Sequence, residues 1–171
     1  RQTWLVNPGI PVPEEARKIH GISDEDLAAA PRFDEVLPLA LVYLSGRIPV
    51  AYNADFDRRF LFAEFGRLGA AIDVEVPPAL RHGGDWIDPR VWGRELQKYE
   101  KGKKLTDVCE RMGITIGQAH RAADDAEAAG RVLLALAKDI PQRYGELIRI
   151  QKQYAARQEA ELATWRGRRG G

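Results

Sequence analysis

The chain has 171 residues, of which 44% are hydrophobic, and its formal net charge at pH 7 is +1. This length and apolar content suffice for one domain with a buried core. The net charge is too close to zero for the electrostatic field of the whole protein to attract a polyanion. Cys109 is the only cysteine, which excludes an intramolecular disulfide. No run approaches the roughly 18 apolar residues of a membrane span. We therefore expect a cytoplasmic protein with no membrane partner.

The first thirty residues alternate short elements with turns. Thr3 to Val6 is a β-rich run that the turn sequence Asn7-Pro8-Gly9 stops. Ser23 is expected to cap a short helix, with Asp26 answering three residues later. Ahead of that helix lies His20-Gly21, where glycine permits close approach of the backbone to a ligand.

The middle of the chain predicts a helix, a strand and a second helix. Phe33 to Leu44 carries apolar residues at helical spacing, and Arg47 to Tyr52 is a short apolar strand. Asn53, a natural N-cap residue, turns this strand into a helix from Asp55 to Leu68. Ligands bind where the carboxyl end of a strand meets the start of a helix in an α/β sheet. We therefore expect Asn53 and Asp57 at a crevice.

The C-terminal half is predicted to be mainly helical. Trp86 to Asp88 is a last short strand, and Pro89 opens the helix that follows. Further helices are expected from Leu105 to Met112, from Arg121 to Lys138, and over a long stretch after Pro141. Seven basic and three acidic residues follow Pro141. This basic end could pack on the core, bind a partner or lie along nucleic acid.

Two segments carry candidate chemistry. The sequence HRAADDA places His120 ahead of a helix and Asp125 inside it, and YNADFD places Asp57 at a strand-to-helix junction. Each residue alone is typical of an ordinary helix start. Together, an imidazole that can accept a proton near neutral pH and two carboxylates that can hold Mg²⁺ suit metal-assisted hydrolysis.

The segments IHGIS, YNADFDRRFL, KLTDVCERMGI and HRAADDA, in this order, resemble the DnaQ-like, DEDDh family of 3′–5′ exonucleases, which includes the proofreading subunit of the bacterial replicative polymerase. The resemblance runs from Thr3 to about Lys138. It implies that Asp57 and Asp125 bind metal and that His120 is the general base. It also implies five residues that contact nucleic acid, namely His20, Gly21, Ile22, Asn53 and Phe56.

The resemblance implies an α/β fold of the ribonuclease H type, with a mixed sheet flanked by helices and two Mg²⁺ or Mn²⁺ ions in the complete site. The family's first motif, an Asp-x-Glu on an opening strand, has no counterpart ahead of Thr3. We therefore expect a sheet that lacks its first two strands, and little or no activity from these 171 residues. Residues 1–140 are expected to form the incomplete exonuclease domain, and residues 141–171 a C-terminal helix and basic tail.

The function implied is a 3′–5′ exonuclease that hydrolyses phosphodiester bonds at single-stranded ends of DNA or RNA by two-metal catalysis. A polymerase or another replication or repair protein is an expected partner. The alternative is a non-catalytic module that keeps the exonuclease fold and binds nucleic acid or a polymerase. An Asp-x-Glu encoded upstream would favour the enzyme.

Overall fold

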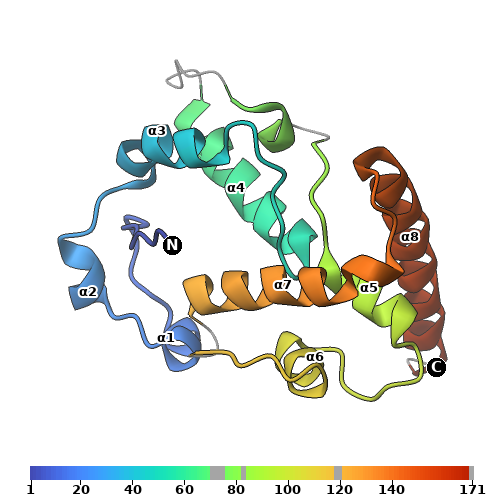
Figure 1. Ribbon diagram of the computed structural model, residues 1–171. Helices are drawn as coiled ribbons and strands as arrows, with labels where there is room; N and C mark the ends of the chain where they lie inside the picture. The colour runs from blue at the N-terminus through green and yellow to red at the C-terminus, as the bar shows by residue number, and fades with distance from the viewer. Residues whose placement is uncertain (70–75, 82–83, 118–120, 170–171) are drawn as a thin grey trace.

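The computed structural model describes residues 1–69, 76–81, 84–117 and 121–169. These residues fold almost entirely into helices (Figure 1). One parallel β-bridge joins Val50 to Ile87, where the Ala51 N–H donates to the Ile87 carbonyl at 3.2 Å and the Ile87 N–H donates to the Pro49 carbonyl at 3.0 Å. The predicted mixed sheet is not confirmed in the described ranges, because the extended segments there form no backbone pairing with a neighbouring strand apart from this bridge.

The N-terminal half forms α1 (Glu14–His20), α2 (Asp24–Ala28), α3 (Phe33–Leu44) and α4 (Ala54–Leu68). The C-terminal half forms α5 (Pro89–Leu96), α6 (Leu105–Arg111), α7 (Ala122–Leu136) and α8 (Tyr144–Arg169). Two 3₁₀ turns, η2 (Pro78–Leu80) and η3 (Ala137–Asp139), complete the helical elements of the described chain. Ser23 and Asp26 form the predicted reciprocal cap of α2, with the Asp26 N–H donating to Ser23 Oγ at 3.2 Å.

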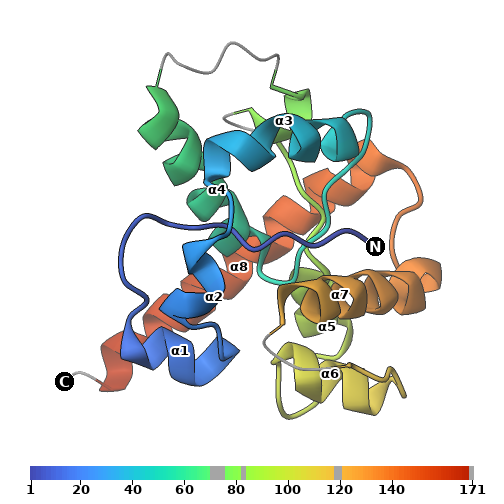
Figure 2. The same cartoon turned by 90° about the vertical axis from the view of Figure 1, so that its left-hand side faces the viewer.

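The larger core lies among α5, α6, α7 and α8. Helix α7 contacts both α5 and α6, and α5 also contacts α8. In Figure 2, α3 and α4 lie on the side opposite α5, α6 and α7, while α8 runs diagonally behind them. The buried side chains of this core include the single cysteine. They are Trp92, Val108, Cys109, Ala128, Val132, Leu136, Ile140, Leu147 and Ile148.

A smaller core joins α3, α4 and η2. Leu37, Leu41 and Leu80 are buried there, and the rings of Phe33 and Phe65 meet edge to face with centroids 6.0 Å apart. The apolar spacing that predicts α3 therefore corresponds to a real buried stripe. This core supports the helix that carries Asp57.

Only the first part of α8 packs on the body. Leu147, Ile148 and Gln151 are buried, whereas residues 159–168 are exposed. Near the middle of the helix, an ion pair of 2.5 Å joins Arg157 to Glu95, and Gln158 Nε2 donates to the Val91 carbonyl at 3.0 Å. The boundary predicted at residue 140 stays a prediction. Within the described ranges, no helix is both long and apolar enough to cross a membrane.

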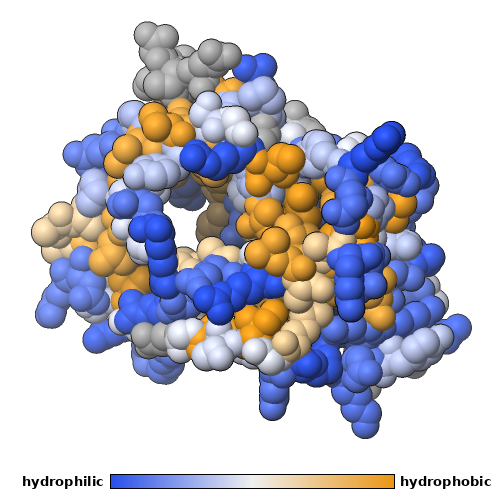
Figure 3. Space-filling model, in the orientation of Figure 1, coloured by the Kyte–Doolittle hydropathy of each residue, from blue (hydrophilic) through white to orange (hydrophobic). Residues whose placement is uncertain are grey.

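The N-terminal segment is extended and crosses the body without joining a sheet. A backbone hydrogen bond of 2.8 Å from the Asn7 N–H to the Pro31 carbonyl ties it to the start of α3. Figure 3 shows an opening between this segment and apolar surface on the other side. Large apolar side chains such as Val42 and Leu134 are 68% and 74% exposed. The described core is therefore open on part of its surface.

Candidate active site

The candidate carboxylate Asp57 lies in the first turn of α4, and a second carboxylate, that of Asp88, fixes where this helix starts. Asp88 Oδ1 accepts the backbone N–H of Asn53 and its Oδ2 accepts that of Ala54, both at 3.0 Å. The same Oδ1 accepts the backbone N–H of Arg90, at 2.9 Å, in the first turn of α5. One buried side chain therefore caps two helices and sets the position from which Asp57 projects.

Asn53 occupies the N-cap position of α4 without capping it. Its backbone is left-handed, with φ 74° and ψ 49°, and it is the only non-glycine residue of the described chain with a positive φ. The Asn53 side chain accepts a hydrogen bond from Arg90 Nη1 at 2.6 Å instead. Asn53 is therefore the N-cap residue by position, as the sequence predicts, but its side chain binds none of the free N–H groups in the first turn of α4.

A residue that the sequence analysis did not select, Gln151 of α8, holds Asp88 in place. Its Oε1 accepts the backbone N–H of Asp88 at 2.9 Å and the indole N–H of Trp92 at 3.1 Å, and its Nε2 donates to the Trp86 carbonyl at 2.9 Å. Gln151 is 9% exposed. A polar residue in helical register with apolar neighbours on a buried stripe is the sequence feature that could have revealed it.

The carboxyl group of Asp57 has a raised pKa. Partial desolvation by the surrounding protein destabilises the charged carboxylate, and the negative charge of Asp88 raises the pKa further. Although the residue is exposed, no basic side chain of the described chain forms an ion pair with it. A bound divalent cation would oppose both causes of the shift.

The second candidate carboxylate, Asp125, lies half-buried in the first turn of α7. It faces α6, where burial raises the pKa of the Cys109 thiol and the charge of Asp125 raises it further. The packing of α7 on α5 and α6 fixes the register of this helix. A packed helix therefore holds Asp125 in place.

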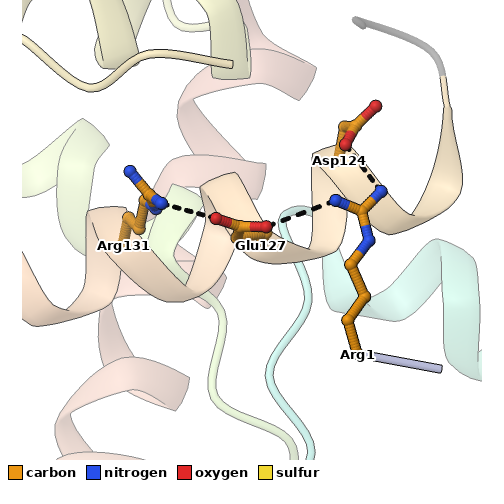
Figure 4. A network of polar contacts seen from close by, with 4 residues as sticks. All are labelled: Arg1, Asp124, Glu127 and Arg131. Carbon is orange, nitrogen blue, oxygen red and sulfur yellow. Dashed lines mark hydrogen bonds and ion pairs between the residues drawn. The ribbon is translucent and has the colours of Figure 1, made fainter. Parts of the chain in front are cut away.

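The neighbouring carboxylate, Asp124, belongs to a separate ionic network on the surface of α7 (Figure 4). Arg1 Nη2 lies 2.6 Å from Asp124 Oδ1, and Arg1 Nη1 lies 3.3 Å from Glu127 Oε2. Arg131 Nη2 lies 2.6 Å from Glu127 Oε1. Of the two adjacent aspartates, Asp124 is thus occupied by Arg1, whereas Asp125 forms no ion pair with a described residue.

His120, the expected general base, lies outside the described residues. The next residue, Arg121, is described, and its side chain approaches the His20-Gly21-Ile22 segment. A β-carbon built on Gly21 would lie 4.0 Å from Arg121 Nη2, and Gly21 itself is left-handed, with φ 68°. The His20 ring accepts the Ile22 N–H through Nδ1 at 3.0 Å. The end of α1 and the start of α7, a hundred residues apart in the sequence, therefore lie close together (Figure 1).

An apolar hollow of about 430 Å³ adjoins the His20-Gly21-Ile22 segment, and Phe60 of α4 lines it. Phe60 packs against Phe56, with ring centroids 4.7 Å apart, and the two residues are 58% and 53% exposed. Exposed aromatic rings beside an apolar hollow suit stacking with a nucleobase. The hollow is lined by Trp4, Leu5, Val6, Pro8, Ile10, Pro11, Val12, Pro13, Ala16, His20, Ile22, Leu27 and Phe60.

The donor chemistry fits a hard divalent cation, because Asp57 and Asp125 offer carboxylate oxygens from the first turns of α4 and α7. The described residues contain no group of three His, Cys, Asp or Glu side chains that could hold a metal ion. The two aspartates are therefore candidate ligands that need further donors.

The chain belongs to the Exonuclease (RNase_T) family, whose model matches residues 3–133. It is 30% identical over 132 residues to the DNA polymerase III PolC-type protein of Caldanaerobacter subterraneus subsp. tengcongensis, an alignment that covers 77% of this chain and 9% of the relative. It is 30% identical over 139 residues to the corresponding protein of Halalkalibacterium halodurans, covering 81% and 9%. The chain thus spans about a tenth of the length of these relatives.

Solved structures share the fold. Exonuclease X in complex with 5′ overhanging duplex DNA matches with a TM-score of 0.63 and 23% identity, covering 86% of this chain and 78% of the other. A 3′-exonuclease that recognises a histone mRNA stem-loop matches with a TM-score of 0.61 and 19% identity, covering 80% and 63%. The resemblance to DnaQ-like exonucleases is therefore confirmed.

Proposed function

We propose that the chain supplies the catalytic side chains of a metal-dependent 3′–5′ exonuclease acting on single-stranded 3′ ends of DNA or RNA. The observation that supports this most directly is the approach of the Arg121 side chain to Gly21, since Arg121 immediately precedes the helix that carries Asp125 and Gly21 belongs to the proposed nucleotide-binding segment. The family match agrees with this assignment and does not favour a non-catalytic module.

Asp57 and Asp125 would hold Mg²⁺ or Mn²⁺, and the bound ions would neutralise charge on the scissile phosphate and on the departing 3′ oxygen. The proposed role of His120 is to accept the proton of the attacking water, because an imidazole titrates near neutral pH. Asn53 would stay at the edge of the site through its bond to Arg90. Phe56, supported by Phe60, would stack on the terminal base, and Gly21 would admit the strand close to the backbone.

The PolC-type relatives are polymerases, so we propose a polymerase or another replication or repair protein as partner, and the cytoplasm as location. Asp57 and Asp125 alone offer fewer carboxylates than a two-metal site uses. We therefore propose that these 171 residues by themselves bind divalent metal weakly and have little nuclease activity.

The test uses a 3′-labelled single-stranded oligonucleotide and two proteins, the 171-residue chain and the product of its complete reading frame. We expect Mg²⁺-dependent release of label by the second protein, and loss of that release in Asp57→Asn and Asp125→Asn. Asp124→Asn is the matched control, because Asp124 pairs with Arg1. Equal activity in all these variants would contradict the assignment, and fast degradation by the 171-residue chain would mean that another carboxylate completes the site.

A further inference from the structure

A second polar feature lies on α4, α5 and α8, where a groove of about 640 Å³ runs between the three helices. Basic side chains from all three helices line it. They are Arg58, Arg59, Arg90, Arg94, Lys152 and Arg166. None of these residues is among the side chains assigned above to metal binding, proton transfer or base stacking.

The acidic residues of the groove are largely engaged. Asp55 pairs with Arg59 at 3.0 Å, and Asp85 pairs with Lys152 at 2.8 Å. The carboxylate of Asp88 accepts three backbone N–H groups. Glu159 is the remaining acidic residue that lines the groove.

Three arginines of the groove, Arg58, Arg94 and Arg166, form no ion pair with a described carboxylate. The Nε atoms of Arg58 and Arg94 are also buried without a hydrogen-bond partner in the described chain. Burial lowers the pKa of Arg94, and the charge of Arg90 one turn away lowers it further. The groove therefore holds an excess of positive charge, which a bound anion would neutralise.

We propose that this groove binds the sugar–phosphate backbone of a single-stranded nucleic acid, as a contact surface additional to the catalytic site. The guanidinium group donates in a fixed fork that matches phosphate oxygens, and a row of such groups along a groove suits a repeating anion. Helix α4 links the two surfaces, since it carries Asp57 as well as the groove residues Asp55, Arg58 and Arg59, although Asp57 does not itself line the groove. The identity of the ligand rests on the proposed function, whereas the anion site rests on the arginines.

The first test measures binding of a fluorescent oligothymidylate by anisotropy in EDTA, across a KCl series, with the full 171-residue chain. The groove variant is R58Q/R94Q/R166Q, and the matched control is K138Q/R143Q/R149Q, which removes the same charge from exposed residues that do not line the groove. Each lost phosphate contact flattens the plot of log affinity against log salt by about 0.7 for a single strand, so the groove variant should lose about 2 from the slope. The control should keep most of the slope of the parent chain. Equal effects in the two triple variants would overturn the proposal.

The second test uses the parent chain without substitution, so its outcome does not depend on whether the triple variants fold. In NMR spectra of the parent chain, the Nε–H signals of Arg58 and Arg94 should shift when the oligothymidylate is added and should not shift with equal charge of polyglutamate. Binding without a shift of either signal would overturn the proposal, as would an equal response to polyglutamate. Neither test needs metal or turnover. An inactive complete protein with groove-dependent binding would refute only the proposed catalysis, and an active one with groove-independent binding would refute only this inference.

Discussion

Gln151 Oε1 accepts the backbone N–H of Asp88 at 2.9 Å, across 63 positions of the sequence. Because Asp88 caps both α4 and α5, this bond connects the C-terminal helix to the helix that carries Asp57. The long α8 is therefore part of the scaffold of the candidate site through its first half, and only its distal part is free to serve another role.

Asp88→Ala should destabilise the chain by about 2–4 kcal/mol, since it removes two helix caps and leaves buried N–H groups without acceptors. Urea unfolding followed by circular dichroism measures this change. Asp85→Ala is the matched control, because its exposed ion pair with Lys152 should contribute less than about 1 kcal/mol. Equal losses in the two variants would mean that the carboxylate of Asp88 is not the cap of α4 and α5.

Asn53→Gly and Asn53→Ala should differ although both remove the bond to Arg90. The left-handed backbone at this position costs a β-carbon about 1–2 kcal/mol, which glycine does not incur. We expect Asn53→Gly to be the more stable variant by about 1 kcal/mol, measured by thermal unfolding. Identical stabilities would show that this backbone relaxes once the asparagine side chain is gone.

The local elements could be predicted because their causes are local. Ser23 and Asp26 predict the start of α2 because they form a capping box. Pro89 predicts the start of α5 because the φ angle of proline is fixed near its helical value. The helix predicted from Asp55 to Leu68 is observed from Ala54 to Leu68. Long-range relationships could not be predicted in the same way. Nothing near Gln151 in the sequence indicates that its partners are Asp88 and Trp92.

The sheet illustrates the same limit. Thr3 to Val6, Arg47 to Tyr52 and Trp86 to Asp88 have the composition of strands, yet only Val50 and Ile87 pair. Composition favours an extended backbone, but a strand is stable only when a neighbour receives its N–H and C=O groups. The roles of Asp57, His120 and Asp125 follow from the family resemblance and remain predictions, whereas the structural role of Asp88 follows from its hydrogen bonds.

Asp57→Asn should stabilise the metal-free chain at neutral pH. The folded-state pKa of Asp57 is raised above its ordinary value of 3.8, so its contribution to stability is fully present below pH 3.8 and is lost as pH rises through the folded pKa. The amide cannot ionise and avoids that loss. Unfolding midpoints in EDTA should therefore favour the variant at pH 7, with the difference shrinking toward pH 3.8. Asp55→Asn, which removes an exposed ion pair with Arg59, should show no such gain.

His120→Ala should lower turnover by about 10²–10⁴-fold in the protein from the complete reading frame, the range for loss of a general base. Affinity for the oligonucleotide should change far less, because the imidazole is assigned to the water and not to the strand. Asp125→Asn should behave differently, raising the Mg²⁺ concentration needed for half-maximal rate. Single-turnover assays over a Mg²⁺ series separate the two effects, and pH profiles add a second criterion, since the alanine variant should lose the rise in rate on deprotonation of the imidazole. Turnover equal to that of the parent at neutral pH would mean that His120 takes no part in the chemical step and only begins the helix that carries Asp125.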